Sequence, residues 1–197
     1  MGGAPVYATH DIPGELTTAR LRLRPLRRGD AGAVHEAIVE SLADLVRWLP
    51  WARPGHGRLD TRRYLRAARD AWSRGSAFEF LVLEANRDTA VGMTSLHRID
   101  RSRRSAGLGY WIRSSRQGRG YATEAARATL DHAFRRLELH RVELHIALEN
   151  AASHGVARHL GARREGVARD AEMISGRFMD HVQYALLSTD PLPEIHG

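Results

Sequence analysis

The sequence contains no cysteine, and all 30 of its basic residues are arginine. Without cysteine, disulfides, thiolate metal sites and cysteine nucleophiles are excluded, and a reducing cytoplasm is the compartment that fits. No stretch approaches the roughly 18 apolar residues of a membrane span. Residues 1–15 lack the apolar core of a secretory signal. These absences predict a cytoplasmic protein that does not insert into a membrane.

Three common motifs are also missing. The phosphate-binding GxxxxGK[ST] loop, the dinucleotide-binding GxGxxG spacing and the zinc-binding HExxH pattern do not occur. The chain has 11 histidines, but His154 and His159 are five residues apart, which does not suit a pair of ligands on one helix face. We therefore expect no metal site.

The charge is strongly basic, with 30 arginines against 23 acidic residues and a net charge of +7. Such a charge attracts anions, including nucleic acid, acidic proteins and phosphorylated cofactors, and does not choose among them. The arginines are spread along the chain, which argues against a dedicated nucleic-acid-binding tail. Whether the excess reflects partners or coding bias stays open.

The length of 197 residues and the 43% hydrophobic content suit one domain with its own core. We predict a flexible leader over 1–14, a single domain over 15–190 and a tail over 191–197. The hydrophobic periodicity predicts strands at 21–26, 78–85, 90–98, 106–112, 141–148, 163–172 and 177–187. A hairpin around Ser175 and Gly176 is expected to join the last two. The sequence also predicts helices at 31–41, 42–49, 60–74, 121–137 and 152–160. Asp60 is expected to cap the third of these helices, and Gly161 is expected to end the last one. The expected fold class is α/β (α+β), a mixed, mostly antiparallel sheet flanked by helices.

The segment most informative about chemistry is a strand, a glycine-rich loop and a helix N-terminus, read as LGYWI, SSRQGRG and YATEAARATL. The first N–H groups of a helix have no helical partners, and the helix dipole adds positive charge there. Gly118 and Gly120 allow close backbone approach, and Arg119 adds a cation. This arrangement predicts a phosphate site. The alternative is a plain turn closed by the two glycines.

The spacing Gln117-x-x-Gly120-x-Ala122 resembles the acyl-CoA-binding motif of the GCN5-related N-acetyltransferase (GNAT) superfamily. The stretch NAASHGVARHLG over 150–161 resembles its second cofactor segment. RLRLRPL, WLPW, AVGMTSL and GARREG are similar to the branch of Rim-type ribosomal-protein N-terminal acetyltransferases. The resemblance covers residues 16–188. It implies an enzyme that uses acetyl-CoA in a cleft between the fourth and fifth predicted strands, where the sheet is splayed.

The resemblance also implies the residues that bind acetyl-CoA. They are Leu108, Tyr110 and Ile112 on the strand, Gln117, Gly118, Arg119, Gly120, Tyr121, Ala122 and Thr123 on the loop and helix, and Asn150 and Ser153 downstream. Gly107 and Gly109 are expected to thin one wall of the cleft. Asn150 either binds the pantetheine arm or ends its strand.

Many relatives place a tyrosine acid in the last helix, but that position is Ala157 here. The Rim-type branch implies Ser153 instead as the group that protonates the thiolate. Ser153 could also serve as the helix cap, since serine is a favoured N-cap residue. For the catalytic base, the resemblance implies Glu79, and its alternative role is a solvated residue on an open sheet face. His97 and His181 are further candidates for the base.

Trp48, Leu49 and Trp51 flank the entrance for the acceptor by resemblance, or alternatively clamp the first helices onto the sheet. Residues 40–75 are expected to set acceptor choice. Our leading prediction is an N-acetyltransferase that acts on a protein N-terminal α-amine, close to ribosomes. The alternatives are an acetyltransferase for a small-molecule amine, such as an aminoglycoside, polyamine or amino-acid derivative, and a non-catalytic RNA- or ribosome-binding module. The edge strands leave room for a homodimer.

Overall fold

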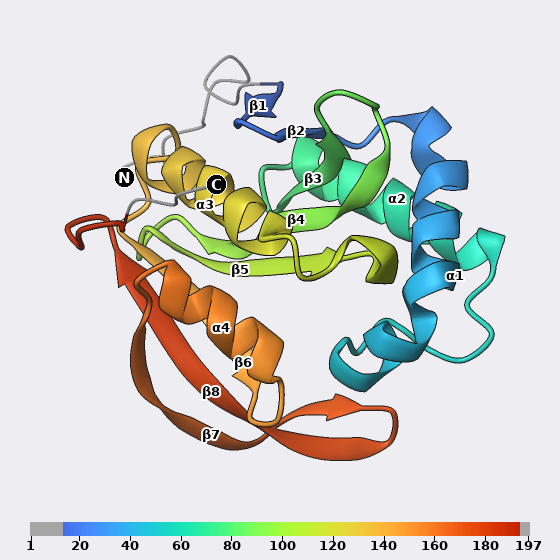
Figure 1. Cartoon of the computed structure of the whole chain (residues 1–197). Helices are drawn as coiled ribbons and strands as arrows, with labels where there is room; N and C mark the ends of the chain where they lie inside the picture. Colours follow the sequence, from blue (N-terminus) through green and yellow to red (C-terminus); the bar gives the residue numbers. More distant parts are fainter. Residues whose placement is uncertain (1–13, 194–197) are drawn as a thin grey trace.

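One mixed sheet carries the strands of the computed structural model, which describes residues 14–193 (Figure 1). The strands are β1 (Leu16–Thr17), β2 (Leu21–Pro25), β3 (Phe78–Glu84), β4 (Ala90–Asp100), β5 (Ser105–Ile112), β6 (Arg141–Ala147), β7 (Arg163–Ile174) and β8 (Arg177–Leu187). The helices are α1 (Ala31–Trp48), α2 (Arg58–Ser73), α3 (Tyr121–Arg135) and α4 (Ala151–His159), with 3-10 turns η1 (Arg28–Asp30) and η2 (Ser114–Arg116). Residues 1–13 of the predicted leader and 194–197 of the predicted tail lie outside the described residues.

The strand order is β1-β2-β3-β4-β5-β6-β8-β7, and every neighbouring pair is antiparallel except β5 and β6. Parallel neighbours need a crossover connection, which α3 supplies between them. The mixed, mostly antiparallel sheet predicted from the sequence is therefore confirmed. The parallel pair of β5 and β6 near the centre of the sheet positions the functional site described below.

Helices cover both faces of the sheet, because successive strand residues point to opposite sides. Phe80 packs with Leu130 of α3 in one buried cluster, to which α4 also contributes. Leu81 packs with Ile38 of α1 and Leu65 of α2 in a second cluster on the other face. In the described part of the chain, no helix is both long and apolar enough to cross a membrane.

Helix α1 is a single helix of 18 residues where the sequence analysis predicts two shorter ones. Its buried residues Val34, Ile38, Ser41 and Leu45 continue one stripe at spacings of three and four. No residue before Pro50 interrupts helical hydrogen bonding, so the helix runs on to Trp48. The prediction of a break near residue 41 was wrong, and the longer helix reaches the cleft described below.

Helix α2 begins two residues earlier than predicted. Gly57 is its N-cap, and Asp60, expected to cap the helix, lies in the first turn. The Asp60 carboxylate accepts the Gly57 backbone N–H at 3.0 Å and the Arg53 side chain at 2.8 Å. A carboxylate at the third residue of a helix accepts a backbone N–H that has no helical partner, as the side chain of an N-cap residue does.

The predicted turns agree with the structure. Gly161 after α4 has a φ of +79°, and Ser175 and Gly176 join β7 to β8 with φ values of +51° and +78°. The long hairpin at the end of the chain is thus confirmed. Strand β1 was not predicted, because two residues are too few for a periodicity.

Candidate functional site

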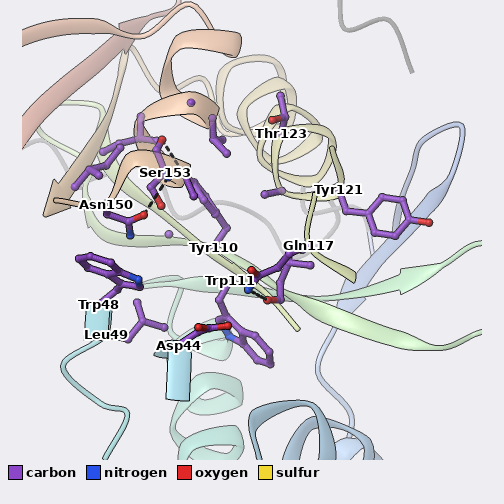
Figure 2. Close-up of a pocket in the computed structure, with 18 of the residues that line it drawn as sticks. Asp44, Trp48, Leu49, Tyr110, Trp111, Gln117, Tyr121, Thr123, Asn150 and Ser153 are labelled. Atoms are coloured by element: carbon purple, nitrogen blue, oxygen red, sulfur yellow. Dashed lines mark hydrogen bonds between the residues drawn. The ribbon is translucent and has the colours of Figure 1, made fainter. Parts of the chain in front are cut away.

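A cleft opens in the sheet between β5 and β6. The two strands pair at three positions only, and the last pair is Gly107 with Glu143. Beyond it, β5 continues to pair with β4, and β6 continues to pair with β8. The gap forms a cavity of about 550 Å³, lined by both strands, α1, α4 and the start of α3 (Figure 2). This is the splayed cleft predicted from the sequence.

Backbone N–H groups converge where the loop after β5 enters α3. Gly118 and Gly120 have φ values of +72° and +78°, a left-handed conformation that glycine adopts without strain. The first helical bond joins the Glu124 N–H to the Gly120 carbonyl at 3.0 Å, so the N–H groups of 121–123 have no partner inside the helix. No heavy atom lies within 4 Å of where a Cβ on Gly118 would be. This open cradle fits the diphosphate of coenzyme A.

Arg20, which was not identified from the sequence, braces the cradle. Its Nε donates to Oε2 of Glu124 at 2.7 Å, and its Nη1 donates to the Arg119 carbonyl at 3.1 Å. The Thr18 hydroxyl donates to the same carboxylate at 2.6 Å. Glu124 therefore ties the β1–β2 turn to the start of α3 across more than 100 residues of sequence. No local sequence signal reports a contact of that range.

Residues of the loop and of the start of α3 bond to neighbouring strands, and most of them also line the cavity. Arg116 donates to Glu84 Oε1 at 3.2 Å, and the Tyr121 hydroxyl donates to the same oxygen at 3.1 Å. Gln117 Nε2 donates to the Ile112 carbonyl at 3.1 Å, which closes the loop back onto β5. Seven predicted residues at this end and the loop line the cavity: Ile112, Gln117, Gly118, Gly120, Tyr121, Ala122 and Thr123. Arg119 is exposed and does not belong to that lining.

The wall from β5 also includes Leu108 and Tyr110, as predicted. Because β5 has no ladder partner on its β6 side after Gly107, peptide groups there are free to pair with an extended ligand. Burial raises the pKa of Tyr110 to about 12. The Tyr110 hydroxyl stays protonated and points to the Ser153 carbonyl at 3.4 Å.

The two glycines of β5 also lie against side chains of β4, and Gly109 lines the cavity. A Cβ on Gly107 would lie 2.6 Å from Nε2 of His97, and a Cβ on Gly109 would lie 3.1 Å from Oγ of Ser95. The glycines therefore make room for side chains of β4, on the face opposite α3. Burial, with smaller effects of Arg98 and His145, lowers the pKa of His97 to about 4.

Helix α4 starts at the cleft. Asn150 Oδ1 accepts the Ser153 N–H at 3.1 Å, so Asn150 is the N-cap and Ser153 is not. Both residues line the cavity, and Figure 2 shows their side chains there. No hydrogen bond of the Ser153 hydroxyl is found among residues 14–193. Ala157, at the usual tyrosine position, is completely buried in the core and does not line the cavity.

Glu79 does not line the cleft. Its carboxylate accepts a short hydrogen bond from the Tyr64 hydroxyl of α2. It borders a separate cavity of about 230 Å³, together with Arg69 and Trp72. Burial raises the pKa of Glu79, and the bond from Tyr64 opposes that rise. The structure thus gives Glu79 a partner of its own, and its role as the base stays a prediction.

The two tryptophans predicted at the acceptor entrance lie in different places. Trp48 lines the cleft near the end of α1, whereas Trp51 does not line it and stacks on Tyr64 with ring centroids 5.6 Å apart. Trp51 therefore occupies the packing position that was its alternative. Asp44 and Leu49 also line the cleft, as do His145 and His181 from β6 and β8. Of these four, the sequence pointed to Leu49 and His181.

Comparison with known proteins agrees with this geometry. Residues 20–163 match the acetyltransferase (GNAT) domain family. YdaF of Bacillus subtilis is 34% identical over 173 residues, covering 86% of this chain and 92% of that protein. The [ribosomal protein uS5]-alanine N-acetyltransferase of Escherichia coli is 29% identical over 180 residues, covering 90% and 93%. The structure of RimL, a ribosomal L7/L12 α-N-protein acetyltransferase in complex with coenzyme A, superposes with a TM-score of 0.82 at 27% identity, covering 89% and 97%.

The match by sequence and the match by structure both extend over the cradle, the splayed strands and α4. Coenzyme A is bound in the RimL structure, which agrees with the open cradle and the unpaired edge of β5 found here. The chain therefore belongs to the GNAT acetyltransferase family and is an acetyl-CoA-dependent N-acetyltransferase.

Proposed function

We propose that this enzyme acetylates the α-amine of a protein N-terminus, and that its acceptors are ribosomal proteins. The main support is the extent of the similarity. The two ribosomal-protein acetyltransferases match 90% and 89% of the chain, a span that includes more than the cofactor half of the fold. A ribosomal acceptor would place the enzyme in the cytoplasm, close to ribosomes.

The groups that line the cleft suit an α-amine. An α-amine has a pKa near 8 and a lysine amine one near 10.4, so deprotonation at pH 7 costs about 1–1.5 kcal/mol for the former and about 4–5 kcal/mol for the latter. Burial lowers the pKa of His181, which lines the cleft. A weak base of this kind suits the more acidic amine better.

The reaction needs no covalent enzyme intermediate. The amine nitrogen attacks the thioester carbonyl carbon, the carbon–sulfur bond breaks, and the amine proton leaves to a base or to water. The Ser153 hydroxyl faces the cleft and has no partner among the described residues, so it is available to hydrogen-bond and protonate the thiolate. The unpaired peptide groups of β5 supply donors for the oxyanion.

Glu79 as the base requires a chain of water molecules, because the residue lies outside the cleft. Glu79→Gln separates its two roles. A shift of the pH–rate profile supports the base. An unaltered profile with normal turnover leaves Glu79 as the partner of Tyr64.

The decisive experiment is an acceptor screen with the full chain and acetyl-CoA, which follows released thiol and product mass. The panel holds peptides with free alanine or serine N-termini, the same peptides blocked at the N-terminus, N-blocked peptides with lysine, spermidine and an aminoglycoside. We expect the free N-terminal peptides to be acetylated at the α-nitrogen. Preference for spermidine or the aminoglycoside would contradict the proposal and support a small-molecule acceptor.

A non-catalytic RNA-binding module is not supported, because the family membership and the open cleft both indicate an enzyme. The net charge of +7 is compatible with an enzyme that works beside ribosomal RNA. A homodimer stays a prediction, and light scattering of the purified chain measures it.

A further inference from the structure

Asp44 of α1 is the one carboxylate among the described residues that line the cleft. Its Oδ2 accepts the Ser114 hydroxyl at 2.7 Å. Across residues 14–193 no arginine or histidine forms an ion pair with it, whereas Glu40, one turn earlier, is paired with Arg113. A partly buried carboxylate without a cation of its own protein is suited to a cation from outside.

The position of Asp44 is fixed by bonds between α1 and the loop after β5. The Ser114 N–H donates to the Ser41 hydroxyl at 3.0 Å, and the Ser115 N–H donates to Glu40 Oε1 at 2.9 Å. Together with the Ser114–Asp44 bond, these contacts hold the second half of α1 beside the cleft. Figure 2 draws Asp44 with Leu49 and Trp111 on one side of the cleft and Ser153 on the other.

Two buried nitrogen atoms, each in a residue that lines the same cleft, have no hydrogen-bond partner among residues 14–193. They are Nε1 of Trp111, in a residue 8% exposed, and Nε2 of His181, in a residue 7% exposed. Buried polar groups in folded proteins are nearly always hydrogen-bonded, and exceptions of this kind occur where a ligand supplies the partner. The Trp111 N–H can only donate, so its partner is an acceptor such as a carbonyl oxygen.

We propose that Asp44 binds the ammonium group of the acceptor and that Trp111 Nε1 donates to its first peptide carbonyl, so that the cleft recognises a peptide N-terminus. This inference rests on the proposed function. An N-terminal residue carries both groups on one α-carbon, whereas a polyamine has no carbonyl. Asp44 stabilises the charged amine, so it acts in acceptor binding, and removal of the proton belongs to another group.

Asp44→Asn tests the charge. The amide oxygen can still accept the Ser114 hydroxyl, so the link to the loop is kept while the charge is lost. We expect the KM for a peptide with a free N-terminus to rise about 10- to 100-fold, as for loss of a charge-assisted bond. We expect kcat to change by only a few fold, and acetyl-CoA affinity, measured by calorimetry, to stay within about 2-fold.

Ser114→Ala is the matched control, because it removes the link and keeps the charge. Its effect on the peptide KM should be smaller than that of Asp44→Asn. Trp111→Phe removes the donor and keeps an aromatic ring, and it should raise KM for the peptide without raising KM for a simple alkylamine. Equal effects of Asp44→Asn and Ser114→Ala would make Asp44 a positioning residue and overturn the inference.

The two proposals fail in different ways. If the wild type acetylates N-terminal peptides and Asp44→Asn leaves their KM unchanged, the ammonium site is refuted and the proposed function stands. If the wild type binds acetyl-CoA and acetylates no peptide N-terminus, the proposed function fails, and this inference fails with it.

Discussion

Gly120 is the residue on which the phosphate cradle most depends. It stands directly before α3 with a φ of +78° and a ψ of 0°. Gly120→Asp would add a negative charge where the diphosphate binds and place a side chain in a left-handed conformation. We expect acetyl-CoA affinity, measured by calorimetry, to fall at least about 100-fold, as expected when several charge-assisted bonds are lost.

The matched control for this prediction is Gly176→Asp. Gly176 also has a φ of +78°, but it lies in the β7–β8 turn. No heavy atom lies within 4 Å of its Cβ position, whereas a Cβ on Gly120 would lie 3.3 Å from Nη2 of Arg20. Gly176→Asp therefore causes backbone strain similar to that of Gly120→Asp, at a place where no phosphate binds. Gly176→Asp should retain acetyl-CoA affinity. Equal loss of affinity in both variants would show that folding, and not the cradle, was damaged.

Ser153 can be tested without disturbing a helix cap, because Asn150 performs that function. Ser153→Ala should lower kcat about 10²- to 10⁴-fold, the scale of a general acid, while acetyl-CoA still binds. Rapid-quench measurement of acetyl transfer checks the chemical step directly. Normal turnover in Ser153→Ala would remove this residue from the mechanism. Asn150→Ala, in contrast, should cost about 1 kcal/mol of stability through loss of the cap.

At the scale of elements, α1 connects the acceptor side of the fold to the cofactor loop. Arg113 Nε donates to Glu40 Oε2 at 2.9 Å, and this bond and those from Ser115 lower the pKa of Glu40 to about 2. Since the pKa is lower in the folded than in the unfolded chain, the ionised carboxylate stabilises the fold above about pH 4.5. That stabilisation is lost as the pH falls through about 2.

Glu40→Gln should therefore destabilise the protein at neutral pH and have little effect at low pH. The pair is partly exposed to solvent, so we expect a cost of about 1 kcal/mol or less at pH 7. Urea unfolding of both proteins at pH 7, 4 and 3 measures the difference. A difference that grows toward pH 3 would contradict the assigned direction of the pKa shift.

The helices and strands also show which features are predicted correctly by the hydrophobic periodicity of the sequence. The clean alternation of residues 141–148 and the turn at Ser175 and Gly176 predicted β6 and the β7–β8 hairpin correctly, because both signals are local. The same approach divided α1 in two after Ser41, whereas the structure has one continuous helix. Ser41 is buried there, and its hydroxyl donates to the Ala37 carbonyl at 2.7 Å, so a polar residue continues the helix.

For the whole molecule, cofactor binding should stabilise the fold. The cleft is built from strands, two helices on one face and α1 on the other, so its ligand contacts most layers of the structure. At a coenzyme A concentration about 100 times Kd, the expected stabilisation is about 2.7 kcal/mol. For a chain of this size that corresponds to a rise in Tm of about 5–10 °C. Differential scanning calorimetry with and without coenzyme A measures it.

Gly120→Asp is the control here too, and its Tm should not respond to coenzyme A. The salt dependence of acetyl-CoA binding is a second check on the basic charge. A single small ligand should lose affinity only moderately between 50 and 200 mM salt, whereas an RNA tract with 6–10 phosphate contacts would lose about 10³–10⁵-fold. A steep loss for acetyl-CoA would contradict a cradle built mainly from backbone N–H groups.

The sequence by itself determined the parts of the site that are contiguous in the chain. The loop with Gly118 and Gly120, the start of α3 and the Asn150–Ser153 turn depend on neighbouring residues, whose conformations and free N–H groups follow from local rules. Contacts between distant segments were decided only by the tertiary structure. Arg20 meets Glu124, His97 fills the space over Gly107, and Asp44 reaches the cleft because of how the sheet stacks and how far α1 runs. Glu79 and Trp51 were placed elsewhere for the same reason, since the face on which a strand residue lies is known from sequence but its neighbours across the layers are not.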